Sequence, residues 1–472
     1  MITPISSARS DLKAEASVYV WLISLVAALG GLLFGYDWVV IGGAKPFYEK
    51  FFALTDPSQE GWAMSCALIG CLFGALGSGA ASDRLGRKKL LLLSALLFAV
   101  SSIGTALAGS FALFVAWRMA GGVAIGIASN LSPMYIAEVA PAPIRGRLVS
   151  LNQLTIVIGI LLAQIVNWLI AQPVPDGATA QEILQSWNGQ TGWRWMFGVT
   201  AVPSFLFLFG MLFAPESPRW LARQGRSDAA RRILEKIGGA RYAAPALDEI
   251  TASLDHDAGK TALRVLFEPK IRRVLGLGIV LAVFQQWCGI NVIFNYAEEV
   301  FSAAGYQVSD ILFNIVITGS VNLLFTLVAF ALVDKFGRRI LMLLGAASLA
   351  IIYTLLGLCY AAHSQGVHVL ALVVAAIGCY AMSLAPVTWV IISEIFPNRI
   401  RGTAMSIAVA FLWIACFILT YTFPILNRNI GAAGTFWIYA SICLAGFCFL
   451  LFRLPETHGK SLETIECDLN RV

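Results

Sequence analysis

The chain of 472 residues contains 58% hydrophobic and only 13% charged residues, and its mean hydropathy is +0.77. A soluble globular protein carries about 25% charged residues, so this composition excludes a soluble fold and indicates a membrane protein with many spans. Twelve spans of about 20 residues each fit the length and leave room for one sizeable segment outside the membrane.

Apolar runs predict these spans in chain order. The first 17 residues are polar, and the apolar run that follows is too long for the hydrophobic region of a cleavable signal peptide. Segment 215–270 contains SDAARRILEKIG, whose spacing predicts short amphipathic helices that lie under the bundle and join its two halves. The predicted spans are 18–42, 60–82, 90–109, 111–137, 148–171, 193–214, 271–301, 309–333, 340–362, 367–393, 402–424 and 433–453.

Lysine and arginine are concentrated on one side of the predicted membrane. They occur in the N-terminal segment, in the loops 83–89, 138–147, 215–270, 334–339 and 394–401, and in the tail, whereas the other side keeps only Lys45, Lys50, Arg194 and Arg428. The positive-inside rule therefore predicts that both termini are cytoplasmic. The net charge of +6 is then a signal of topology, and no nucleic-acid partner is expected.

Two loop motifs each occur twice. SDRLGRK at 82–88 recurs as VDKFGRR at 333–339, and EVAPAPIRG at 138–146 recurs as EIFPNRIRG at 394–402. Such repeats predict two halves of six spans with a binding site between them near the midplane, as in alternating-access transporters. The predicted division is a bundle at 1–214, an intracellular helical linker at 215–270, a second bundle at 271–453 and a cytoplasmic tail at 454–472.

All cysteines except Cys467 lie in predicted spans, where they are interpreted as small packing residues. Neither they nor the four histidines show the spacing of metal ligands. We therefore expect neither a metal site nor a cofactor.

The span at 271–301 carries four amide side chains at membrane depth: Gln285, Gln286, Asn291 and Asn295. Unpaired polar groups in lipid are costly, so these amides are expected to face protein or water. On an ideal helix Gln285, Asn291 and Asn295 share about a third of the circumference, and Gly289 permits a kink. Amides that both donate and accept suit a neutral ligand rich in hydroxyl groups. The alternative is that they only join helices to one another.

Asp37 and Arg118 are charged residues within predicted spans. A charge at mid-membrane costs about 2.5–3.5 kcal/mol on insertion scales, so the two are expected to face each other. A buried carboxylate beside an arginine can bind and release a proton as its surroundings change. The alternative is a static structural salt bridge.

Several longer motifs occur together in this chain. They are GGLLFGYD at 30–37, PESPRWL at 215–221, QQWCGIN at 285–291 and PETHGKSLE at 455–463, besides the two D-R/K-x-G-R loops and the two E-x-x-P-x-x-x-R-G loops. With them the chain resembles the sugar porter family of the major facilitator superfamily over nearly its whole length. It is similar to bacterial proton-linked sugar symporters and to facilitative glucose transporters. The resemblance implies an all-α membrane protein of 12 transmembrane helices in two pseudo-symmetric six-helix bundles.

The resemblance also implies a central sugar site. Aromatic faces pack on the C–H side of a sugar while amides bind its hydroxyls. Asn295 stands where tyrosine is usual, Ile160 and Leu412 where some members have glutamine, and Ala385 where glycine is usual, so these positions bear on the preferred sugar. The implied amides are Gln153, Gln285, Gln286, Asn291 and Asn322, with Asn295 as a further candidate, and the implied aromatic wall is Phe34, Trp389 and Trp413.

In the resembling symporters an aspartate matching Asp37 couples transport to a proton, whereas uniporting relatives have an uncharged residue there. Asp37 and Arg118 therefore favour symport. The resemblance further implies a cytoplasmic gate of charges that joins the bundles when the cavity opens outward. A single surface ion pair contributes only about 0–1 kcal/mol, so the gate needs the whole network; as an alternative, its basic members serve topology alone. The gate residues are Asp83, Arg87, Glu138, Arg145, Arg147, Glu216, Asp334, Arg338, Glu394, Arg401 and Glu456.

The predicted function is import of a monosaccharide, a hexose or a pentose, with a proton through the cell membrane, driven by the proton gradient. The protein is expected to work as a monomer in the lipid bilayer. One alternative is a facilitative uniporter. Another is a sugar sensor, against which the short tail argues. No catalytic or nucleotide-binding constellation is visible, so an enzyme is not expected.

Overall fold

The computed structural model describes residues 18–175, 177–257, 268–364, 366–396, 401–454 and 456, without the side chains of 253–257, 270, 333, 334, 393, 401 and 402. The first 17 residues, most of the predicted tail, and the side chains of Asp334 and Arg401 therefore lie outside the described part of the chain. The described residues are helical or irregular and contain no strand.

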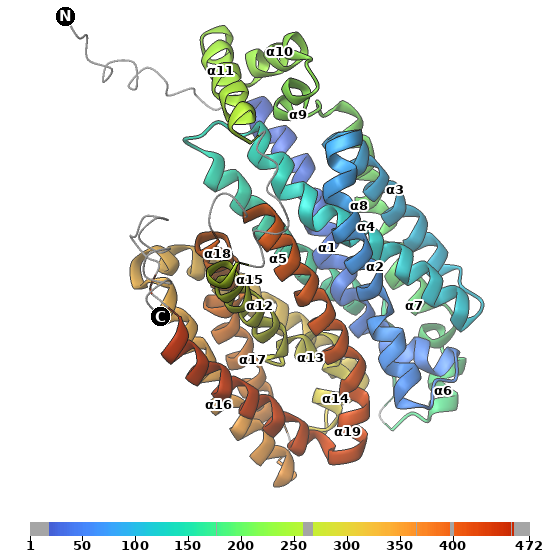
Figure 1. Cartoon of the computed structure of the whole chain (residues 1–472). Helices are drawn as coiled ribbons and strands as arrows, with labels where there is room; N and C mark the ends of the chain where they lie inside the picture. The colour runs from blue at the N-terminus through green and yellow to red at the C-terminus, as the bar shows by residue number, and fades with distance from the viewer. Residues whose placement is uncertain are drawn as a thin grey trace, which may run out of the picture.

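The N-terminal helices pack together as one bundle (Figure 1). Polar caps define several of their starts: Asp56 accepts a hydrogen bond from the Ser58 amide before α2, and Ser110 accepts one from the Leu113 amide before α4. A π-helical turn, Asn188–Gly192, precedes α7. The helices are α1 (Val18–Phe51), α2 (Pro57–Leu85), α3 (Arg87–Ala106), α4 (Phe111–Val139), α5 (Arg145–Ile170), α6 (Ala180–Gln185), α7 (Trp193–Gly198) and α8 (Ala201–Phe213).

Three helices follow at one end of this bundle, as Figure 1 shows: α9 (Pro218–Arg223), α10 (Ser227–Gly238) and α11 (Ala240–Asp257). On α10 the buried residues Ala230, Leu234 and Ile237 lie at i, i+4 and i+7, the spacing of one helical face. On α9 the Trp220 indole donates to the Asp83 carbonyl at 3.0 Å and holds this helix against the end of α2. The prediction of short amphipathic helices between the halves is confirmed.

The remaining helices form a second bundle beside the first (Figure 1). They are α12 (Pro269–Trp287), α13 (Ile290–Asn295), α14 (Ala297–Ser302), α15 (Val308–Phe336), α16 (Arg338–Ala361), α17 (Val367–Met382), α18 (Leu384–Ile395) and α19 (Arg401–Arg453).

Eleven helical stretches of the described chain are long and apolar enough to cross a membrane, and the last of them, Thr403–Arg453, has 51 residues. At about 1.5 Å per residue this stretch would span about 76 Å, more than twice the hydrocarbon thickness of about 30 Å. It is interrupted at Gly431, which has φ 70° and ψ 173°. If this stretch is counted as the two spans predicted at 402–424 and 433–453, the described part of the chain contains the predicted twelve spans.

Three predicted spans are interrupted in the structure, the first of them at the glycine where a kink was expected. The span at 271–301 is interrupted at Gly289 and again at Tyr296, and the span at 367–393 is interrupted at Ser383. The span at 193–214 separates into α7 and α8. Gly289 has φ 87°, a left-handed conformation in which glycine meets no steric penalty. After Ser383 the chain reaches Pro386, which has no amide proton to donate to the preceding turn.

The end predicted for the first span at residue 42 is also wrong, because α1 continues to Phe51. The extension contains Lys45 and Lys50, which were predicted to lie in the loop after the first span, and it also contains Glu49. Lys45 and Glu49 are instead buried. Gly42 and Gly43 lie inside this helix, and a Cβ on Gly42 would be 2.8 Å from the Phe294 carbonyl oxygen. Gly42 thus serves close packing of α1 against α13 of the other half.

Candidate functional site

Three of the four amides in the seventh predicted span form a hydrogen-bonded chain. Gln286 Nε2 donates to Gln285 Oε1 at 2.5 Å, and Asn291 Nδ2 donates to Gln286 Oε1 at 2.5 Å. Gln285 Nε2 in turn donates to the Tyr380 hydroxyl of α17 at 2.8 Å. All three amides are buried. Tyr380 was not predicted from the sequence, since it lies among apolar residues in a span with no marking motif.

The interruption at Gly289 makes this chain possible. On a continuous helix, residues five apart such as Gln286 and Asn291 would point about 140° away from each other. The helix ends at Trp287 and restarts at Ile290, so that Asn291 turns back toward Gln286. The expectation that these amides share one face of a continuous helix is therefore wrong, while the expectation of a kink at Gly289 is confirmed.

Gly289→Ala should destabilise the protein and disturb the amide chain. The left-handed backbone costs a residue with a Cβ about 1–2 kcal/mol, and the new Cβ would lie 2.8 Å from Cγ of Tyr439. We expect a lower midpoint of thermal unfolding in detergent. Gly276→Ala in α12 is the matched control, since a Cβ there meets no atom within 4 Å. Equal midpoints for the two variants would contradict this role of Gly289.

An aromatic cluster joins the two halves next to the amide chain. Phe34 and Trp38 of α1 and Trp413 of α19 lie with ring centroids 6.0 Å apart in each pair. Asn291 Nδ2 lies 3.5 Å from Cys416 Sγ, one turn after Trp413, so the amide chain and the aromatic cluster border the same stretch of α19. The predicted pair Phe34 and Trp413 is thus brought together. Trp38 was missed, although its position four residues after Phe34 places it on the same helical face.

The other predicted sugar-binding residues lie on three further helices. Gln153 on α5 is partly buried, Asn322 on α15 is buried, and Trp389 on α18 keeps 37% of its surface exposed. In the described part of the chain, none of the three is hydrogen-bonded to the amide chain. Their roles in binding remain predictions.

The predicted pairing of Asp37 with Arg118 is confirmed. Arg118 of α4 donates from Nη1 to Asp37 Oδ1 at 2.8 Å and from Nη2 to the Asp37 carbonyl at 3.3 Å. Both side chains are buried, so each provides the opposite charge that the other needs away from water. Asp37 Oδ2 is buried without a hydrogen-bond partner among the described residues.

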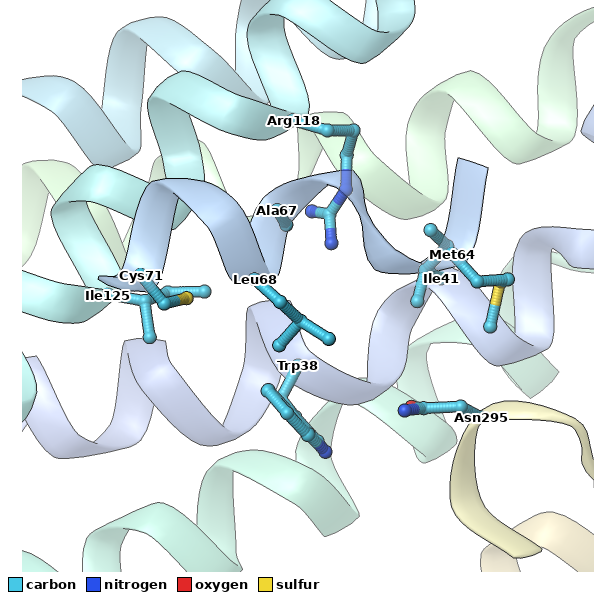
Figure 2. A pocket seen from close by; sticks show the side chains of 9 residues that line it. All are labelled: Trp38, Ile41, Met64, Ala67, Leu68, Cys71, Arg118, Ile125 and Asn295. Carbon is cyan, nitrogen blue, oxygen red and sulfur yellow. The ribbon is translucent and has the colours of Figure 1, made fainter. Parts of the chain in front are cut away.

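Asn295, one helical turn after Asn291 on α13, makes no hydrogen bond to the other amides among the described residues. Its side chain points into a small pocket that also contains Trp38 and Arg118 (Figure 2). Arg118 and Trp38 belong to the first half and Asn295 to the second, so this pocket joins the halves beside the Asp37–Arg118 pair. The rest of its lining is Ile41, Met64, Ala67, Leu68, Cys71 and Ile125.

At the end of the molecule that carries α9–α11, the first repeated loop forms a compact charge cluster. Arg87 Nη2 lies 3.0 Å from Glu138 Oε1, and Arg87 Nη1 lies 3.4 Å from Asp83 Oδ1. The Glu216 carboxylate accepts from the backbone amides of Arg87 and Lys88 at the start of α3, at 3.0 and 3.1 Å. A carboxylate is favourable there because amides at a helix start are unpaired and carry partial positive charge.

The second repeated loop forms the same arrangement. Arg338 Nη2 lies 3.5 Å from Glu394 Oε1, and the Glu456 carboxylate accepts from the backbone amides of Arg338 and Arg339 at 3.0 and 3.1 Å. Each of these pairs joins residues of one half. Two further predicted gate residues, Arg145 and Arg147, are exposed. The structural equivalence of the two loops confirms the symmetry that the sequence repeats predicted.

Sequence comparison decides the family. The profile described as "Sugar (and other) transporter" matches residues 23–469. The chain belongs to this family of transporters. The match covers nearly the whole chain.

Similar family members include proton symporters of known sugars. The chain is 40% identical to the D-xylose-proton symporter of Escherichia coli, covering 95% of this chain and 96% of the relative. It is 40% identical to the arabinose-proton symporter of Bacillus subtilis, covering 96% of each. The galactose-proton symporter of E. coli is 37% identical, with 95% of this chain and 94% of the relative covered.

The fold is that of a solved transporter. The xylose transporter of E. coli in a partially occluded inward open conformation matches with a TM-score of 0.83 and 39% identity, over 94% of this chain and 100% of that chain. The inward open conformation of the same transporter matches with a TM-score of 0.82. A structure bound to 6-bromo-6-deoxy-D-glucose matches with a TM-score of 0.79.

Proposed function

We propose that this protein imports a monosaccharide, a hexose or a pentose, together with a proton by alternating access. The observation that carries the proposal is the buried amide chain and aromatic cluster between two matching bundles, with the Asp37–Arg118 pair beside them. Uncharged donors and acceptors next to aromatic faces suit a neutral ring with hydroxyl groups. The names of the xylose, arabinose and galactose symporters at 37–40% identity support this substrate class.

The sugar site would take amides from several helices. Hydroxyl groups of the sugar would replace the bonds that Gln285, Gln286 and Asn291 make to one another, and the faces of Phe34 and Trp413 would pack on its C–H side. The complete proposed set adds Gln153, Asn295, Asn322 and Trp389. The proton would bind at Asp37, so the proton gradient is the source of energy and no cofactor is proposed.

The conformation supports alternating access. On the basis of the positive-inside rule, we propose that the end with α9–α11 and both termini face the cytoplasm. At the opposite end the halves are in contact: Arg428 Nη1 of α19 donates to the Thr55 carbonyl at 3.3 Å, and Trp62 of α2 packs on Phe417. At the cytoplasmic end the charge clusters around Arg87 and Arg338 join residues of one half. These contacts support our inference that the structure is an inward-facing state.

In this scheme the moving bodies are the bundles 1–214 and 271–453, joined by the linker 215–270 and followed by the tail 454–472. A single chain supplies both halves of the site, so we propose that the monomer in the cell membrane is the working unit. The gate residues would meet across the halves only in the outward-facing state.

A competition experiment tests the substrate class. Purified protein in liposomes is assayed for uptake of labelled xylose, arabinose, galactose or glucose, each against a set of unlabelled hexoses, pentoses and sugar alcohols. We expect saturable uptake of at least one monosaccharide, with competition by its close stereochemical relatives. Absence of uptake for every monosaccharide would overturn the proposal.

Trp389→Ala should weaken sugar binding. Its exposed indole face would pack on the sugar ring, and loss of such a contact corresponds to about 1 kcal/mol or more, several-fold in Kd. Equilibrium binding of the transported sugar measures the change. Trp437→Ala is the control. Trp437 is similarly exposed, at 41%, but it lies on α19 and lines a surface pocket formed by residues 434–445, to which Trp389 does not contribute. An unchanged Kd for Trp389→Ala would remove this residue from the site.

A further inference from the structure

We propose that Lys45 closes the outer end of the transporter by binding carboxylates of both halves, an arrangement we term the outer latch: Lys45, Glu49, Glu298 and Glu299. The proposal rests on the alternating-access function above and identifies what holds the outer end shut. None of these residues was singled out from the sequence, because Lys45 was placed in a loop outside the first span.

The contacts of Lys45 cross the boundary between the halves. Its ammonium lies 2.9 Å from Glu49 Oε1 on the same helix, 3.4 Å from Glu298 Oε2 and 2.5 Å from Glu299 Oε1 on α14. The ammonium also lies 5.8 Å from the centre of the Tyr296 ring, a favourable position for a cation. One lysine of the first half is thus bound to several groups of the second.

Burial makes this arrangement strong. The Lys45 side chain is 2% exposed, whereas Glu298 and Glu299 are 22% and 20% exposed. An ammonium taken out of water requires close opposite charge, and removing its partners leaves a buried unpaired charge. Removing one partner of an ion pair in this position therefore costs more than removing one on the open surface. The partial exposure of the two glutamates means that water can reach this side of the latch when the halves separate.

The charges in the latch are unequal, since three carboxylates surround one ammonium. Like charges at short distance in a poorly polar environment repel each other. Lys45 is consequently the group that holds α1 against α14, and its loss leaves carboxylates of both halves facing one another. Loss of one glutamate, in contrast, leaves an ammonium with two remaining partners.

The latch can open without leaving Lys45 unpaired. Glu49 lies on α1, four residues from Lys45, and moves with it. Glu298 and Glu299 lie on the short helix α14, which follows the interruption at Tyr296. When α1 and α14 separate, Lys45 exchanges two partners of the other half for water and retains Glu49. The Tyr296 hydroxyl donates to the Thr420 carbonyl of α19 at 2.6 Å. The residue directly before α14 therefore stays attached to the second half.

The test measures the distance across the outer end in the full-length protein. Spin labels are attached at the exposed positions Gln59, on α2, and Gln307, before α15, in a background without accessible native cysteines. We expect Lys45→Met to add a population at longer distance. The charge-exchanged variant Lys45→Glu/Glu299→Lys keeps one cation and three carboxylates and should restore the short distance. Lys50→Met removes a charge from the same helix and should leave the distance unchanged.

If Lys45→Met does not fold, Glu298→Gln/Glu299→Gln supplies the decisive measurement. It removes both partners on α14, keeps the Lys45–Glu49 pair, and should also lengthen the distance. A wild-type distance distribution in the available variant, or failure of the exchanged variant to restore it, would overturn the latch. The distances are measured without sugar or proton gradient, so this result stands apart from sugar uptake. Absence of uptake by the wild type would instead overturn the transport proposal.

Discussion

We expect Asp37→Asn to abolish accumulation of sugar against its gradient while exchange of labelled sugar across the membrane continues. Arg118 donates to Asp37 Oδ1, and an asparagine keeps an oxygen for this bond. The other oxygen, Oδ2, has no partner among the described residues and is where a proton would bind. Asparagine replaces it with an amide that takes up no proton. The helix packing therefore survives the substitution, but the link to the proton gradient does not.

Two measurements in the same liposomes check this prediction. One is the steady-state ratio of internal to external sugar under an imposed proton gradient, and the other is exchange of labelled for unlabelled sugar without a gradient. Asp310→Asn, an exposed aspartate in the first turn of α15, is the matched control and should accumulate sugar as the wild type does. Undiminished accumulation by Asp37→Asn would rule out its role in proton coupling.

Gln286→Ala should lower sugar affinity by about 1–3 kcal/mol, roughly 5- to 150-fold in Kd. Gln286 occupies the middle of the amide chain, donating to Gln285 Oε1 and accepting from Asn291 Nδ2. Truncation removes a donor and an acceptor for the sugar and leaves two neighbouring amides without their partner. The loss of affinity is therefore larger than for a residue at the edge of the site.

Equilibrium binding of the transported sugar to purified protein tests this effect. Asn130→Ala is the control, because Asn130 of α4 also makes two hydrogen bonds from a partly buried amide, to the Ala75 carbonyl and to Ser78 Oγ, but entirely within the first half. It should reduce stability without changing the Kd. Equal sugar affinity in Gln286→Ala and the wild type would show that the amide chain only joins helices.

Charge and repetition allowed much of this structure to be predicted. A buried charge requires a partner, and Asp37 and Arg118 lie deep inside predicted N-terminal spans and have opposite charge, so their pairing followed from the sequence. The repeated loops indicated two equivalent halves, and the carboxylates of Glu216 and Glu456 do bind equivalent helix starts. The family motifs likewise pointed to Gln285, Gln286 and Asn291, which the fold brings into one chain.

The positions at which helices are interrupted were harder to predict from the sequence. The apolar run within 271–301 gives no sign of where the helix ends. The helix end depends on the left-handed backbone at Gly289 and on the packing of Tyr439 against it. Apolarity measures depth in the membrane and carries little information on backbone direction.

The outer latch was missed for a related reason. A lysine near the end of an apolar run ordinarily marks the membrane surface, and the prediction ended the span before Lys45. Its burial depends on Glu298 and Glu299, which are remote in sequence and face it only because α14 packs against α1. A contact of this kind is a property of the tertiary fold.

The central claim, a neutral sugar carried between the halves with a proton, is tested most directly by sugar-driven proton movement. Purified protein is placed in liposomes that contain a pH-sensitive dye, the membrane potential is held at zero, and the transported sugar is added outside. The account predicts acidification of the interior that saturates with sugar and is absent in Asp37→Asn. Sugar entry with no change of internal pH would contradict it and identify a uniporter.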